Sequence, residues 1–174
     1  VLNGLNGGIV SEIFTPQNGD DSSDDRPRLV LDTNTVLALW MFRDPTLTAL
    51  REWIEAGNCR LYSREDALEE LRSVLRYEHF GVSQGLQNEI FAAYVSRLSS
   101  PQAAFPLASQ CEALQLPKCK DEDDQKFLEI TALSRAQALL TRDKALLRLA
   151  QHRRIRTRFA ITRPDRFFAP PRMA

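Results

Sequence analysis

Leu29-Val30-Leu31-Asp32-Thr33-Asn34 is the stretch that decides the fold of this chain. Three apolar residues followed at once by residues that cap helices predict a buried strand that turns directly into a helix. A second stretch of this kind is Leu139-Leu140-Thr141, which is followed by Arg142 and Asp143. An acid just past a buried parallel strand lies at the carboxyl edge of the sheet, where open α/β folds place their ligand crevice. Asp32 and Asp143 are therefore expected to meet at one crevice.

Strand and helix patterns alternate along the rest of the chain. The predicted strands are residues 29–31, 60–62, 138–141 and, as a late edge strand, 159–162. The predicted helices are residues 46–56, 65–75, 88–98, 123–135 and 144–150, whereas residues 101–119 have no clear pattern. This alternation predicts an α/β fold with a central parallel sheet flanked by helices.

The composition limits the chain to one ordinary domain. Its 174 residues are 43% apolar, which suits a single core. Residues 1–27 are rich in Gly, Asn, Ser and Asp and are expected to form a mobile arm, because they bury too little to offset their ordering entropy. The domain is expected to span residues 28–168, with residues 169–174 as a C-terminal tail.

Hydropathy and cysteine content indicate a cytoplasmic protein. No run approaches the 18 or more apolar residues of a membrane span, and the first residues lack the pattern of a signal peptide. The three cysteines show no CxxC spacing and are accompanied by only two histidines, which argues against both a disulfide framework and a zinc site. We therefore expect no membrane association and a reducing compartment.

Charge is unevenly distributed although the net charge is zero. Residues 1–27 hold five acids and one Arg, whereas residues 142–174 hold ten Lys or Arg and two Asp. The basic end, with Arg153, Arg154 and Arg156 at its centre, suits a polyanion such as nucleic acid. A solvated charged face is the other interpretation, and the sequence leaves both open.

Two further acids lean toward the core side of predicted helices. On a helical wheel, Glu70 borders the apolar stripe of residues 65–75, whereas Glu69 points away from it. Asp124 shares a face with Phe127 and Leu128. Both acids are thus candidates for the crevice that Asp32 and Asp143 are expected to form.

Each acid also has an ordinary structural explanation. Asp32 and Asp143 can cap the helices that follow them, Asp124 can complement a helix dipole, and Glu70 can be a solvated helix acid. The joint pattern favours a cluster, because three unrelated caps have no reason to accompany an inward-leaning Glu70. Two carboxylates about 4 Å apart repel by about 4 kcal/mol at an effective dielectric near 20, so a cluster needs protons or a cation. Oxygen ligands with no nearby His indicate Mg²⁺ or Mn²⁺.

Four motifs resemble the PIN-domain proteins in order and spacing. They are Leu31-Asp32-Thr33-Asn34, Leu68-Glu69-Glu70-Leu71-Arg72-Ser73-Val74-Leu75, Asp121-Glu122-Asp123-Asp124-Gln125-Lys126-Phe127-Leu128 and Leu140-Thr141-Arg142-Asp143-Lys144-Ala145-Leu146-Leu147. The resemblance covers about residues 28–168 and is closest to the bacterial VapC-like toxins of toxin-antitoxin systems. Each motif is weak alone, but four in register are specific. Glu122, Thr35 and Arg142 depart from the usual pattern of Pro, an apolar residue and Gly, and none of these departures removes an acid.

The resemblance implies a PIN-like three-layer sandwich and metal-dependent cleavage of RNA. It carries over Asp32, Glu70, Asp124 and Asp143 as catalytic and metal-binding residues, with Asn34 and Thr141 as polar support. The implied partners are an RNA substrate and a cognate antitoxin, and whether the chain forms a homodimer is open. Phosphodiester hydrolysis needs an activated water and neutralised phosphate oxygens, which divalent ions held by carboxylates supply. Arg142 and the Arg153, Arg154 and Arg156 cluster are expected to hold the phosphate backbone.

Two other functions compete with this interpretation. One is a catalytically idle PIN-like module that binds RNA or a protein through the basic end, against which the intact acid quartet argues. The other is a phosphotransferase of the haloacid dehalogenase type, which also has an acid after its first strand. That class needs a second Asp two residues later, where this chain has Asn34.

Overall fold

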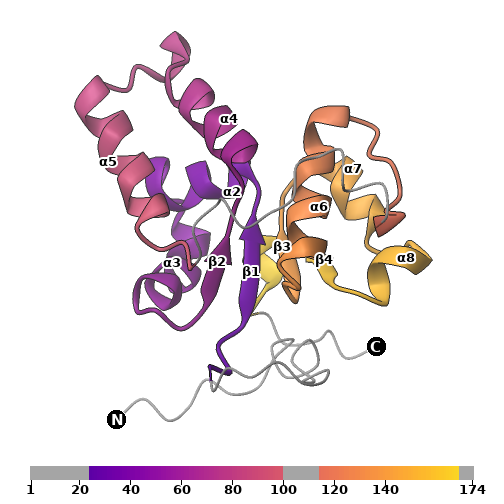
Figure 1. Ribbon diagram of the computed structural model, residues 1–174. Helices are drawn as coiled ribbons and strands as arrows, with labels where there is room; N and C mark the ends of the chain where they lie inside the picture. Colours follow the sequence, from indigo (N-terminus) through magenta and orange to yellow (C-terminus); the bar gives the residue numbers. More distant parts are fainter. Residues whose placement is uncertain (1–23, 100–113, 169–174) are drawn as a thin grey trace.

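A four-stranded parallel sheet lies at the centre of the computed structural model, which describes residues 24–99 and 114–168 (Figure 1). The strands are β1 (Arg28–Leu31), β2 (Arg60–Tyr62), β3 (Ala138–Leu140) and β4 (Ala160–Thr162), in the order β2-β1-β3-β4. All three strand pairings are parallel, and Leu31 of β1 lies opposite Leu140 of β3. The predicted parallel α/β sheet and the edge position of its last strand are confirmed.

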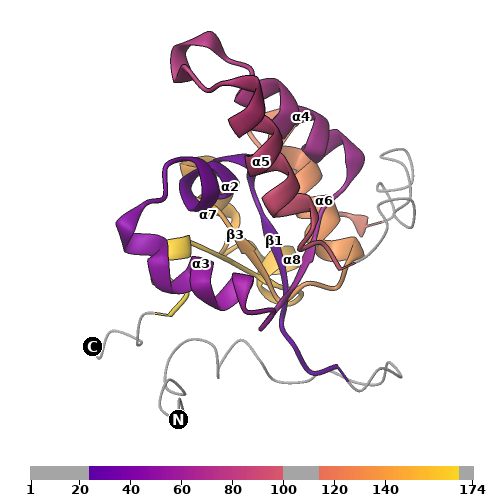
Figure 2. The same ribbon diagram turned by 90° about the vertical axis from the view of Figure 1, so that its left-hand side faces the viewer.

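Successive side chains of each strand point to opposite faces of the sheet, so the core consists of two buried clusters, one on each face. Leu29, Leu31 and Leu140 belong to one buried cluster, with residues of α3, α4 and α5. Val30 and Leu139 point to the other face and pack with residues of α6, α7 and α8. The sheet therefore lies between two helical layers, as a three-layer sandwich requires; Figure 2 views it from the side of α3 and α5.

The helices cover both faces and connect successive strands. The α-helices are α2 (Thr33–Val36), α3 (Thr48–Glu55), α4 (Glu65–Leu75), α5 (Gln84–Val95), α6 (Gln125–Leu133), α7 (Lys144–Leu149) and α8 (Arg153–Arg156). Shorter turns are the π-helical η1 (Leu37–Met41) and the 3₁₀ turns η2 (Pro45–Leu47), η3 (Glu78–Phe80), η6 (Glu122–Asp124) and η7 (Pro164–Arg166).

Several predicted helix boundaries were wrong, each for a local reason. Helix α5 begins four residues before the predicted start, because the Ser83 side chain caps it by accepting a hydrogen bond from the Leu86 amide. It ends at Val95, and the chain then turns so that the Ser99 amide donates to the carbonyl of Leu61 in β2. Helix α6 is preceded by the 3₁₀ turn η6 instead of starting at residue 123.

The end of the expected arm is held on the domain. Arg26 donates to the carbonyl of Gly57 at 2.9 Å, and Asp24 forms an ion pair with Arg60 at 3.2 Å. Residues 1–23 and the expected tail 169–174 lie outside the described residues, as does most of segment 101–119. In the described ranges, no helix is both long and apolar enough to cross a membrane.

Candidate functional site

Asp32 and Asp143 follow the two central strands and are joined through Thr141. The Asp32 amide donates to the carbonyl of Leu140, which continues the pairing of β1 with β3 beyond the strand ends. The Thr141 hydroxyl donates to Oδ2 of Asp32, and Oγ1 of Thr141 in turn accepts a hydrogen bond from the Asp143 amide at 2.9 Å. The carboxyl edge of the sheet thus brings the two predicted acids to one place, with Thr141 as the polar support between them.

Asp32 is a buried carboxyl with an additional capping role. Its side chain accepts the Thr35 amide at 2.7 Å and so caps α2, while the whole residue is only 3% exposed. Burial raises the pKa of Asp32 above its usual range; hydrogen bonds from Thr141 and Thr35 oppose the rise, and the charge of Asp143 adds to it. The capping and cluster interpretations therefore hold at the same time for this residue. Thr35, which departs from the family pattern, satisfies its buried hydroxyl by donating to Leu140 at 3.0 Å.

Asp124 lies among the other acids and does not cap its helix through a side-chain hydrogen bond. Its pKa is raised to about 6 from 3.8, first by burial and then by the charges of Asp143, Asp121, Glu70 and Asp32, in that order. Three of these four are the other members of the predicted quartet. The structure thus brings all four acids close enough for their charges to act on one carboxyl.

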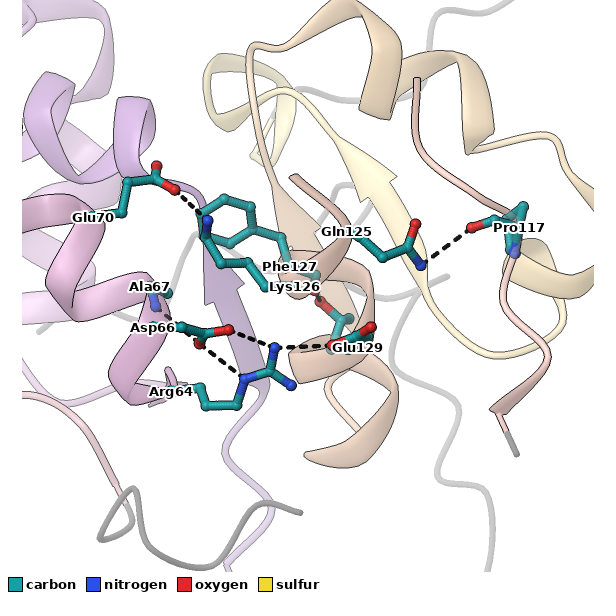
Figure 3. Close-up of polar contacts among 10 residues, drawn as sticks. Arg64, Asp66, Ala67, Glu70, Pro117, Gln125, Lys126, Phe127 and Glu129 are labelled. Atoms are coloured by element: carbon teal, nitrogen blue, oxygen red, sulfur yellow. Dashed lines mark hydrogen bonds and ion pairs between the residues drawn. The ribbon is translucent and has the colours of Figure 1, made fainter. Parts of the chain in front are cut away.

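Glu70 is paired with a cation that sequence reasoning missed. Its Oε2 lies 2.5 Å from Nζ of Lys126, and the two side chains are only 29% and 14% exposed (Figure 3). Lys126 comes two residues after Asp124 and extends from α6 toward α4. It therefore neutralises part of the acid cluster from within the domain.

A second bridge joins the same two helices one turn away (Figure 3). Arg64, just before α4 and only 8% exposed, binds Asp66 at 2.7 Å and Glu129 of α6 at 2.9 Å. Burial alone would raise the pKa of Asp66, but hydrogen bonding to the Arg64 guanidinium and its positive charge act against this. As a result, the pKa of Asp66 lies below its usual value. The two bridges join α4, which carries Glu70, to α6, which begins directly after Asp124.

An open hollow is lined in part by two of the acids. Its volume is about 620 Å³, and Asp124 and Asp143 contribute to its wall. The remaining wall comes from the 3₁₀ turn before α6 and the first turn of α7: Lys120, Asp121, Glu122, Asp123 and Ala145. Solvent and a ligand can thus reach two of the four acids.

The donor chemistry fits Mg²⁺ or Mn²⁺, but the carboxylates are not drawn together around one point. In the part of the chain that the structure describes, no three His, Cys, Asp or Glu side chains are arranged so that they could hold a metal ion together. The reason is visible in their partners: Lys126 holds Glu70, Oδ1 of Asp143 caps α7 by accepting two amides, and both oxygens of Asp32 accept hydrogen bonds. The metal-binding role of the quartet therefore stays a prediction.

The four arginines expected to bind phosphate lie in two different places. Arg142 adjoins the acids and forms an ion pair with Asp44 at 2.7 Å, and its buried Nε has no hydrogen-bond partner among the described residues. Arg153, Arg154 and Arg156 are exposed on α8, which leads into the start of β4. Because β4 is parallel to β3, α8 lies toward the amino end of the sheet, away from the acids (Figure 1). Asn34 is exposed in the first turn of α2.

Comparison with known proteins gives one family. A family model described as PIN domain matches residues 28–145, which include all four acids. No curated protein and no solved structure matches the chain significantly.

Proposed function

The chain belongs to the PIN domain family, and from that premise we propose that it is a metal-dependent endoribonuclease whose acids are Asp32, Glu70, Asp124 and Asp143. PIN domains are nuclease-type domains that act on nucleic acid, and the proposal adds RNA as the substrate and Mg²⁺ or Mn²⁺ as the cofactor. The observation that carries it is geometric: Asp32 and Asp143 are joined through Thr141 at the carboxyl edge of the sheet, and Asp143 and Asp124 line one open hollow. The pKa of Asp124 is raised in keeping with this, since the charges of the three other acids all contribute to the rise. Uncompensated negative charge beside an open hollow attracts a divalent cation.

Each side chain has a distinct part in the proposed reaction. Asp32, fixed by Thr35 and Thr141, is the rigid ligand at the centre, because its two hydrogen bonds hold one carboxyl orientation. Asp124 and Asp143 line the hollow and are the ligands that the substrate side can reach. A divalent ion held there supplies an activated water and neutralises the phosphate oxygens.

Glu70 and Arg142 complete the proposed site. Glu70 is the ligand, or the group that orients the attacking water, once it is released from Lys126. Arg142 has a partly exposed side chain next to Asp143 in the sequence, and we propose that its guanidinium donates to a phosphate oxygen. Asn34 is proposed as polar support at the mouth of the site.

We further propose that the chain is the toxin of a toxin-antitoxin pair, with an antitoxin protein as its partner. This rests on the resemblance of its four motifs to VapC-like proteins. Expression of the chain in a bacterial host should arrest growth, and Asp32→Asn should not. Normal growth with the intact chain at the same protein level would contradict the toxin role without affecting the nuclease proposal.

The nuclease proposal is tested with purified protein and single-stranded RNA. Cleavage is expected with Mn²⁺ or Mg²⁺ and should stop with EDTA, because the proposed ligands are hard oxygens. Cleavage that persists undiminished in EDTA would exclude the metal mechanism. If the protein binds RNA but neither cleaves it nor binds Mn²⁺ in a calorimetric titration, the idle PIN-like module is the correct alternative.

A further inference from the structure

Four aromatic rings gather where α4 passes into α5. Phe80 is the central ring, and its centroid lies 4.1 Å from His79, 5.8 Å from Phe42 and 6.3 Å from Tyr77. The Tyr77 and Phe80 rings are nearly parallel, with an interplanar angle of 15°, whereas Phe42 meets Phe80 edge-on at 72°. We call these four residues the aromatic platform.

The aromatic platform is open to solvent and serves neither core cluster. Phe42 is 58% exposed and Tyr77 is 52% exposed, and none of the four rings belongs to the buried clusters on the two faces of the sheet. Single exposed apolar side chains are ordinary, but a group of exposed rings in mutual contact marks a binding surface. The rings are thus available to a ligand without any change in the core.

A short chain of contacts connects the aromatic platform to the acid site. Phe42 follows the helical turns that begin at Asp32, at the carboxyl edge of the sheet. Arg43 adopts a positive φ of 47°, a left-handed conformation that turns the chain back at this point. The next residue, Asp44, forms the ion pair with Arg142 beside the acids. The first ring is therefore two residues from a direct contact with the proposed site.

We propose that the aromatic platform stacks the bases of the single-stranded RNA that the acid site cleaves. This inference rests on the proposed nuclease function and adds to it a binding surface for the unpaired bases of the strand, outside the acid site. Ring faces bind bases of any sequence, whereas paired bases are hidden within their own stack. Arg43 and Arg76 are exposed next to Phe42 and Tyr77 in the sequence and supply positive charge for the phosphate backbone of the RNA. Glu78, in the same segment, carries a negative charge. Aromatic rings with charged neighbours suit a ligand that has both bases and phosphates better than they suit an apolar protein partner.

The test measures binding of a short fluorescein-labelled single-stranded RNA by fluorescence anisotropy in EDTA, so that nothing is cut. The variants are Phe42→Ala and Tyr77→Ala, both at exposed positions where truncation should leave the fold intact. Tyr77→Phe keeps the ring, and Leu86→Ala removes a 45% exposed apolar side chain outside the aromatic platform. A ribose-phosphate strand of equal length without bases measures the electrostatic part alone.

Each Ala variant should weaken binding of the RNA roughly 5- to 150-fold, the range that base-aromatic stacking supplies. The strand without bases should bind equally to all variants, and Tyr77→Phe and Leu86→Ala should match the unaltered protein. Equal affinities of all variants for RNA would overturn the proposal, as would losses of the same size for the strand without bases. A change from dimer to monomer in light scattering, with RNA affinity unchanged, would assign the rings to a second copy of the chain and overturn it too.

The readout also separates this inference from the proposed function. Binding in EDTA does not depend on catalysis, so a protein that stacks RNA but never cuts it would refute the nuclease alone. A protein that cuts RNA with unaltered affinity in Phe42→Ala and Tyr77→Ala would refute the aromatic platform alone.

Discussion

Replacing Asp124 by Asn should stabilise the metal-free protein at neutral pH. The pKa of Asp124 rises from 3.8 to about 6 on folding, so the folded state disfavours the ionised form by about two pKa units. At about 1.4 kcal/mol per unit this gives ~3 kcal/mol as an upper limit. Partial exposure of the side chain screens the effect to about 1–2 kcal/mol. No side-chain capping bond is lost, and the lost dipole interaction costs about 0.3–1 kcal/mol.

The unfolding free energy of Asp124→Asn should therefore exceed that of the unaltered protein by about 1 kcal/mol, which raises the melting temperature by about 2–4 °C for a chain of this size. The pH dependence has a definite sign. A raised folded-state pKa means that the folded protein holds the proton more tightly, so the penalty is complete above about pH 7 and disappears as the pH falls below about 4. The gain from Asp124→Asn should therefore be present at pH 7–8 and absent at pH 4.

The assay is thermal melting at both pH values, with and without Mn²⁺, beside Asp123→Asn. Asp123 is an exposed acid in the same turn, and it is the matched control for loss of one charge. Stabilisation by Mn²⁺ should shrink in Asp124→Asn, because stabilisation by binding scales with affinity. A variant that is less stable at pH 7, with an unaltered response to Mn²⁺, would refute the assignment of Asp124 to a crowded metal site.

Three further changes test the surroundings of the acids. Lys126→Met should lower the unfolding free energy of the metal-free protein by about 1.5–3 kcal/mol, because Glu70 loses its charged partner. The stabilisation by Mn²⁺ in thermal melts should become larger, because the ammonium no longer competes for Glu70. An unchanged or smaller Mn²⁺ shift would contradict that competition. Arg64→Met should cost about 3–5 kcal/mol in urea unfolding, because it leaves the largely buried carboxylate of Glu129 unpaired. Arg72→Met, at an exposed pair, should cost less than about 1 kcal/mol, and equal losses would contradict this account of the helix bridge. Gln in place of the three arginines of residues 153–156 should lower the log-log salt slope of RNA binding by about 0.7 per lost contact, with the cleavage rate at saturating RNA unchanged; an unchanged slope would identify α8 as solvated surface.

The sequence was informative wherever local pattern controls the result. The apolar run before Asp32 predicted a central strand and its cap, and the stripe of residues 65–75 predicted α4 at its observed bounds. The short helix α8 was missed because Ile155 is its one apolar residue among three arginines, so no periodicity exists to detect. Local pattern also misplaced the start of α5, since the Ser83 cap precedes the predicted start by five residues.

Long-range ion pairs could not be predicted in the same way. The partners of Glu70 and Arg142 are Lys126 and Asp44, and each pair depends on how two distant elements pack. Such pairs are neither periodic nor tied to a fixed spacing, so a single sequence carries no signal for them. The sequence thus predicts which acids gather, and the structure adds the cation that holds one of them.

The central claim is that the four acids form a catalytic metal site, and an Mn²⁺ titration of RNA cleavage tests it most directly. The rate should rise from background in EDTA to saturation in the unaltered protein. Asp32→Asn should stay at background at every Mn²⁺ concentration without loss of melting temperature, because Asn can still accept the Thr35 amide that caps α2. Equal titration curves for the two proteins would contradict the claim.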